Sequence, residues 1–219
     1  MPLTPKPLRF LGLAALVLSC LLGGCASTWV DEPQDDPAGE LETVMEAWRT
    51  ARAEGRSGEP ERVALERLLA KYPRDVDLLY SAAVLAHAAG DRERARGHLD
   101  IARKLDPRFA EAVALRARLA LEAGNLRAAE RLLSTQLELN PDHPDLYETR
   151  AAVSYLSGRH DDAREDLALA EKFGAPSWRV DYHRGLIAEA QGQGPRAADY
   201  YRRLQKPQAP PAARSRHRA

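Results

Sequence analysis

The chain has 219 residues, and its 32 basic and 32 acidic side chains give a formal net charge of zero at neutral pH. A balanced charge of this kind gives no global attraction to nucleic acid. Both cysteines, Cys20 and Cys25, lie near the start. The rest of the chain has no thiol, which excludes a disulfide framework or a cysteine metal site there.

The first 24 residues are predicted to be a secretory signal peptide. Lys6 and Arg9 give a positive start, and the run from Phe10 to Leu22 is almost entirely apolar. This run is too short to cross a bilayer, but it has the length of the apolar region of a secretory signal. An ordinary signal peptide cut near Ala26, with an incidental Cys25, is the alternative.

The segment Leu-Gly-Gly-Cys at 22–25 resembles the bacterial lipobox. In that motif the signal is cut before the cysteine, so the resemblance implies that Cys25 becomes the mature N-terminus and carries acyl chains. Several acyl chains on one residue hold a protein at a membrane far more firmly than one chain does. Ala26 is not the Asp that favours inner-membrane retention in the best-known bacteria. By analogy we expect the outer membrane, facing the periplasm, with the inner membrane as the alternative.

Residues 25–40 are predicted to be the lipidated N-terminus and an acidic, flexible tether. The stretch from Ser27 to Glu40 contains five acidic residues, two prolines and no basic residue. Such a composition is typical of disorder. Repulsion from anionic lipid would hold the folded part of the chain away from the membrane surface.

Residues 41–205 contain an internal repeat of 34 residues. Glycines recur at this interval, an alanine follows each glycine by five residues, and a bulky residue follows it by nine. A small residue precedes each glycine by seven, and prolines share the same period. The repeated residues are Gly90, Gly124, Gly158 and Gly192; Ala95, Ala129, Ala163 and Ala197; Leu99, Leu133, Leu167 and Tyr201; Ala83, Ala117, Ala151 and Gly185; and Pro73, Pro107 and Pro141.

This pattern resembles the tetratricopeptide repeat (TPR). The resemblance implies an all-α solenoid in which pairs of antiparallel helices stack into a right-handed superhelix with one concave face. Glycine at the turn permits a left-handed backbone, and small residues such as Ala83 and Ala95 let paired helices approach closely. The Asp-Pro step at 106–107 ends a second helix, because a residue before proline disfavours helical geometry.

We expect about five helix pairs and no sheet. The first pair is degenerate, because a longer loop from Gly55 to Pro60 replaces the tight turn. A Pro-rich, basic and disordered tail is predicted at 206–219. The predicted helices are 40–54, 60–71, 76–89, 92–105, 110–123, 126–139, 144–157, 160–173, 178–191 and 194–205.

The sequence offers no motif for catalysis, a cofactor or a metal. It contains no phosphate-binding glycine loop, no His-Glu-x-x-His and no Gly-x-Ser-x-Gly. The His-Asp-Asp cluster at 160–162 takes the repeat positions of 92–94, the polar start of a second helix, and it lacks a third ligand by spacing. Arginines also recur every 34 residues, at Arg116, Arg150 and Arg184, so they belong to the architecture. We expect a protein that is not an enzyme and that carries no cofactor.

In TPR proteins the concave groove is lined mainly by positions 2, 5, 9, 12 and 13 of each first helix. The resemblance therefore implies an aromatic and aliphatic wall with one arginine within it, and aromatic residues and Arg are enriched at binding hot spots. Packing of some of these tyrosines between helices is the alternative. The predicted partner-binding residues are Tyr80, Val84, His87, Arg118, Leu121, Tyr155, Tyr182 and Leu186.

The groove is expected to accept an extended peptide or a helix with apolar anchors. Chaperone-tail receptors of the TPR family clamp a terminal carboxylate with Lys and Asn, but Tyr80 and Val84 occupy those positions here. The C-terminal end of the solenoid is a second expected contact, with a partner or a second copy of the chain. The Pro-rich segment after Gln205 cannot continue a helix, so no terminal helix covers Tyr200 and Leu204.

The leading hypothesis is a lipid-anchored periplasmic scaffold that binds partner proteins during assembly of an envelope machine such as a pilus or a secretion apparatus. Lipoproteins of this layout resemble assembly factors of type IV and tight-adherence pili. They also resemble adaptors for cell-wall hydrolases, which is the first alternative. A catalytic accessory protein that uses His87 or His183 as a base is the alternative from another class.

Overall fold

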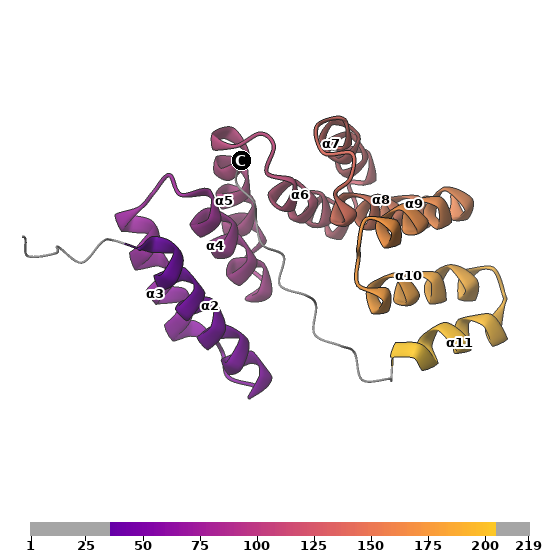
Figure 1. The fold of residues 1–219 in the computed structure, drawn as a ribbon, viewed down its shortest axis with the longest axis horizontal. Coiled ribbons are helices and arrows are strands. Elements are labelled where there is room, and N and C mark those ends of the chain that lie inside the picture. The colour runs from indigo at the N-terminus through magenta and orange to yellow at the C-terminus, as the bar shows by residue number, and fades with distance from the viewer. Residues whose placement is uncertain (1–35, 205–219) are drawn as a thin grey trace, which may run out of the picture. The chain divides into compact units, whose positions relative to one another are not determined.

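The computed structural model describes residues 36–204, and within this range it contains ten α-helices and no strand (Figure 1). The predicted signal peptide, Cys25 and the predicted tail at 206–219 lie outside the described residues. The all-α prediction is confirmed for the described chain. The helices are α2 (Pro37–Ala53), α3 (Glu59–Lys71), α4 (Val76–Ala88), α5 (Arg92–Leu105), α6 (Ala110–Glu122), α7 (Leu126–Leu139), α8 (Pro144–Leu156), α9 (His160–Lys172), α10 (Ser177–Ala190) and α11 (Gly194–Leu204).

The largest difference from the predicted helix ends is at the start of α2. This helix begins at Pro37, so it includes the last four residues of the range predicted as a flexible tether. Proline is favourable in the first turn, because its missing N–H group would have no intrahelical partner there. Leu41 and Val44 then pack against Leu65 and Leu68 of α3, which stabilises the helix from its first turns onward.

Each tight turn between paired helices contains a glycine of the repeat with a left-handed backbone, at φ values between 71° and 83°. Glycine adopts this conformation without the steric cost of a Cβ atom. After the turn, Asp91 accepts a hydrogen bond from the backbone N–H of Arg94, and Asn125 accepts one from Ala128, each over 3.0 Å. These caps satisfy N–H groups that have no partner in the first helical turn. The glycines are Gly90, Gly124, Gly158 and Gly192.

The alanines and leucines of the second helices are 0% exposed in three successive repeats. Alanine is small enough to let two helix backbones approach, and the burial of each leucine side chain contributes about 1.5–3 kcal/mol. The repeated pattern therefore describes the core of the protein. The buried residues are Ala95, Ala129, Ala163, Leu99, Leu133 and Leu167.

Successive helix pairs stack through four apolar clusters, each of which joins neighbouring pairs. One cluster joins α2, α3 and α4; the next joins α4, α5 and α6. The third joins α6, α7 and α8, and the fourth joins α8, α9 and α10. The first helices of adjacent pairs also contact each other directly, α4 with α6, α6 with α8, and α8 with α10 (Figure 1).

The last pair has a different contact at the repeated small position. Gly185 of α10 occupies it, and a Cβ atom added there would overlap the ring of Tyr201 of α11. The missing methyl group makes room for the larger side chain. The Tyr201 hydroxyl then donates a hydrogen bond to the Glu189 carboxylate over 2.9 Å.

The apolar residues at the C-terminal end are partly covered within the described chain. Tyr200, Tyr201 and Leu204 are each half-buried. The Arg203 guanidinium lies 5.2 Å from the centre of the Tyr200 ring, so its stem covers part of this surface. A contact of this end with a partner or a second copy stays a prediction.

Candidate partner-binding groove

The first helices of four successive pairs line one hollow with a volume of about 530 Å³. We call this hollow the groove. The charged and polar lining residues alternate with aromatic and aliphatic ones along it. Its lining residues are Tyr80, Val84 and His87 from α4; Glu111, Ala114, Leu115 and Arg118 from α6; Asp145 and Glu148 from α8; and Trp178, Arg179, Tyr182 and His183 from α10.

Five of the eight residues predicted from the sequence line the groove together. They come from three helices that are far apart in the sequence. Whether they bind a partner stays a prediction. These residues are Tyr80, Val84, His87, Arg118 and Tyr182.

The other three predicted residues do not line the groove. Leu121 packs against the apolar cluster between α6 and α8. Tyr155 packs against the cluster between α8 and α10, and its ring centre lies 5.8 Å from that of His160. Leu186 is half-buried on α10. For Tyr155, packing between helices is therefore the observed role.

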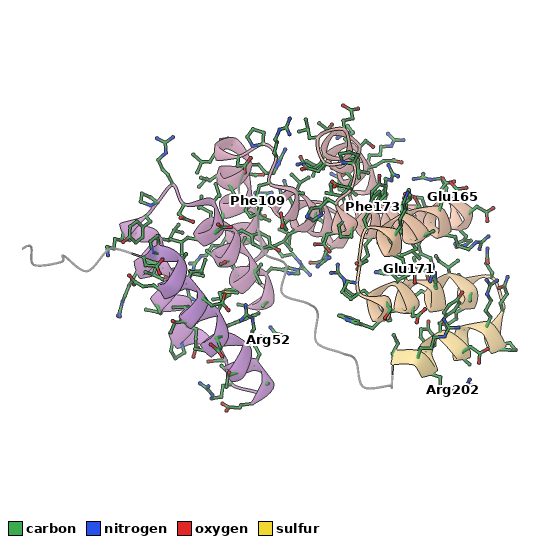
Figure 2. All side chains as sticks on the ribbon, in the orientation of Figure 1. Arg52, Phe109, Glu165, Glu171, Phe173 and Arg202 are labelled. Carbon is green, nitrogen blue, oxygen red and sulfur yellow. The ribbon has the colours of Figure 1, made fainter. Side chains whose placement is uncertain are left out.

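Tyr80 combines both roles. Its ring meets Phe109 edge-on, with 5.3 Å between the ring centres, and it also borders the groove. Phe109 precedes α6 and is labelled in Figure 2. The aromatic wall at this end of the groove is thus anchored in the apolar cluster between α4 and α6.

Trp178, Leu115 and His183 line the groove but were missed by the prediction from repeat positions. They occupy positions 1 and 6 of their first helices, next to the positions that the family pattern favours. Trp178 and Tyr182 stand one turn apart on α10, and their side chains are 47% and 46% exposed. The one-turn spacing of these two large aromatic residues is the sequence signal that would have found Trp178.

A buried carboxylate joins α8 to α10 at the floor of the groove. Only 6% of the Glu148 side chain is exposed, and the Arg179 Nε–H donates to its Oε1 over 2.9 Å. Arg179 Nη1 also lies 2.9 Å from Oδ1 of Asp145, and His183 Nε2 lies 3.4 Å from the Glu148 carboxylate. Burial alone would raise the pKa of Glu148, but the hydrogen bond with His183 and the charge of Arg179 lower it below the ordinary value.

A similar bridge joins α4 to α6. His87 Nε2 lies 2.8 Å from one oxygen of Glu122, and the Arg92 Nε–H donates to the other over 3.1 Å. Burial raises the pKa of Glu122, whereas the hydrogen bonds from His87 and Arg92 lower it, with a net decrease. The two histidines considered as possible bases are both ion-pair partners between neighbouring repeats.

The recurring arginines also join helices. Arg116 donates to Asp100 over 3.1 Å, and Arg184 donates to Glu171, labelled in Figure 2, over 2.7 Å. Arg150 binds Asp166 of α9 through two of its nitrogens. These contacts agree with the architectural role predicted from their period.

Among residues 36–204, no group of three or more histidine, cysteine, aspartate or glutamate side chains is arranged to hold a metal ion. No helix in the same range combines the length and the apolar character needed to span a membrane.

The tetratricopeptide repeat family model matches four overlapping segments, residues 49–108, 86–144, 114–177 and 157–213. Together they span most of the chain. The chain belongs to the TPR family. This membership confirms the interpretation of the 34-residue period, and it identifies the groove as a hollow on the first helices of TPR units.

Solved structures of other TPR proteins share the fold. A thermophilic TPR protein of Thermus thermophilus, TTC0263, is 19% identical, with a TM-score of 0.66 over 75% of this chain and 89% of that one. PilF of Pseudomonas aeruginosa is 16% identical, with a TM-score of 0.59 over 77% of this chain and 76% of its own. MamA of Desulfovibrio magneticus RS-1, from residue 41 to its end, is 15% identical, with a TM-score of 0.54 over 77% and 95%. At these identities the likeness shows the superhelical TPR fold alone.

Proposed function

We propose that this TPR protein is a lipid-anchored scaffold on the periplasmic side of the outer membrane, which binds partner proteins through the groove. The observation that carries the binding role is the groove itself, a hollow across four repeats with two large aromatic side chains, Trp178 and Tyr182, about half exposed. Aromatic side chains at this exposure are typical anchors of protein interfaces.

The anchor and the location rest on the sequence. The Leu-Gly-Gly-Cys segment at 22–25 supports lipidation at Cys25, and the acidic stretch from Ser27 supports a spacing between the membrane and the TPR domain. A role in assembling a pilus or a secretion apparatus rests on the resemblance of this layout to that of pilus-assembly lipoproteins. The likeness of fold to PilF and MamA is compatible with an adaptor role and adds nothing finer.

A scaffold is favoured over a catalytic accessory protein by the contacts of the two histidines. His87 and His183 each bridge a first helix to a carboxylate of the neighbouring one, at 2.8 Å from Glu122 and 3.4 Å from Glu148. This arrangement gives both histidines a structural role without any reaction.

Quantitative capture of envelope proteins tests the binding role. We expect proteins that co-purify with the wild type from solubilised native membranes to be lost when Trp178→Ala and Tyr182→Ala are combined, because the exposed aromatic anchors are removed. The matched control combines Ile101→Ala and Leu139→Ala, which truncate exposed apolar residues of α5 and α7, 45% and 38% exposed, outside the groove. Equal capture by both double variants would contradict a role of the groove.

A further inference from the structure

Within residues 36–204, the charged side chains that line the groove are paired with opposite charges, with one exception. Arg179 pairs with both Asp145 and Glu148, and Glu111 lies 3.6 Å from His143. Arg118 also lines the groove and is exposed, but it forms neither an ion pair nor a side-chain hydrogen bond in this range. The groove therefore presents one guanidinium group whose donors are open to a ligand.

This guanidinium stands among aromatic residues. Arg118 belongs to α6, which lies next to α4 with its Tyr80 in the stack, and Trp178 and Tyr182 of α10 line the same hollow. A ligand bound at Arg118 therefore has aromatic surface within the same hollow, on a helix before α6 and on a helix after it. Burial of an apolar side chain against such surface stabilises a complex, while the guanidinium selects the charge beside it.

We propose that the groove binds a segment of a partner protein in which an Asp or Glu side chain pairs with Arg118 and a neighbouring apolar side chain packs on the aromatic residues. This inference rests on the proposed function and states the chemistry of its partner. A carboxylate matches the planar guanidinium with two parallel hydrogen bonds, which are stronger than neutral ones. A basic segment is disfavoured, because the carboxylates of Asp145 and Glu148 are already occupied by Arg179.

The carboxylate belongs to an internal side chain rather than to a chain end. Arg118 lies on α6, and the groove continues from there to α4 in one direction and through α8 to α10 in the other. A peptide that passes through this groove fills both parts, whereas a chain that ends at Arg118 would leave one part empty. A nucleic acid is disfavoured, because its binding requires several phosphate contacts and the described lining of the groove offers one open cation.

Selection from a displayed library of random peptides, fused at both ends so that no terminus is free, tests the inference. The immobilised proteins are the full chain, its Arg118→Glu variant and the control Arg127→Glu. Arg127 is an exposed residue of α7 outside the groove, and it also lacks an ion pair within the described range. We expect the wild type and the Arg127 variant to enrich peptides with Asp or Glu beside an aromatic or aliphatic residue. The Arg118→Glu variant should enrich Lys or Arg at that position instead.

A synthetic copy of a selected peptide gives the second measurement. Replacement of its Asp by Asn, or of Arg118 by Gln, should weaken binding about tenfold, in line with the loss of one charge-assisted hydrogen-bonded pair. The two losses should not add when both replacements are combined.

Selected peptides without a conserved acidic residue, or with equal affinity for the wild type and the Arg118→Gln variant, would overturn the inference. So would enrichment only of peptides with a free terminal carboxylate from a matched library with open C-termini. The proposed function would survive each of these results if envelope proteins were still lost with the Trp178 and Tyr182 double variant, so the two failures are distinguishable.

Discussion

Among single residues, the contact between Gly185 and Tyr201 is specific to the last repeat. The three preceding repeats have alanine at the small position and leucine at the bulky one, whereas the last has glycine and tyrosine. Since a Cβ atom at Gly185 would overlap the Tyr201 ring, the two residues depend on each other. The alanines are Ala83, Ala117 and Ala151, and the leucines are Leu99, Leu133 and Leu167.

The variant Gly185→Ala should therefore lower the free energy of unfolding by about 1–3 kcal/mol, because overpacking outweighs the gain in helix propensity. The double variant Gly185→Ala with Tyr201→Leu restores the pair found in the other repeats and should recover most of that loss. Urea unfolding of the two single variants and the double variant measures the coupling. If Gly185→Ala alone is as stable as the wild type, the packing described for α10 and α11 is wrong.

At the scale of helices, ion pairs between neighbouring first helices hold the sides of the groove together. Arg179 and His183 of α10 contact Glu148 of α8, and His87 of α4 contacts Glu122 of α6. The lowered pKa values of Glu148 and Glu122 mean that the ionised carboxylates stabilise the folded chain.

The pKa of Glu148 predicts how its contribution varies with pH. A carboxyl group with a pKa lower in the folded than in the unfolded state contributes stability above its unfolded pKa, and it loses that contribution as the pH falls through the folded pKa. Glu148→Gln should lower the free energy of unfolding by about 1–3 kcal/mol at about pH 7, and by much less at about pH 3.5. Urea unfolding at both pH values measures this difference.

Glu138→Gln is the matched control for this prediction. Glu138 is an exposed residue of α7 without an ion pair in the described part of the chain, so its replacement should change little at either pH. A cost for Glu148→Gln that does not depend on pH would show that the carboxylate does not stabilise the fold through its charge.

The helices could be predicted closely from the sequence because local residues determine where they end. Gly90 requires its left-handed backbone wherever the neighbouring repeats lie, and Asn125 caps α7 through the N–H group of a residue three positions away. The groove could be predicted only in part. Which first-helix side chains line it depends on the angle between stacked pairs and on side-chain length, so Leu121 packs into a cluster while Trp178 reaches the hollow.

For the whole molecule, the account joins a lipid anchor to a TPR groove. Lipidation requires the thiol of Cys25, so Cys25→Ser should leave the protein unprocessed or soluble in the periplasm. Fractionation and incorporation of a labelled fatty acid measure both outcomes, with Cys20→Ser as the control that removes the other thiol. Unchanged membrane association and labelling of the Cys25 variant would refute the lipobox assignment.

The central claim is that partner proteins occupy the groove in the cell. The most direct measurement places a photoreactive amino acid at Tyr182, inside the groove, or at Ile101, which has a similar exposure of 45% on α5 and lies outside it. After irradiation of intact cells, the account predicts one or a few covalent adducts with envelope proteins from position 182 and none of them from position 101. The same adducts from both positions, or none from position 182, would contradict it.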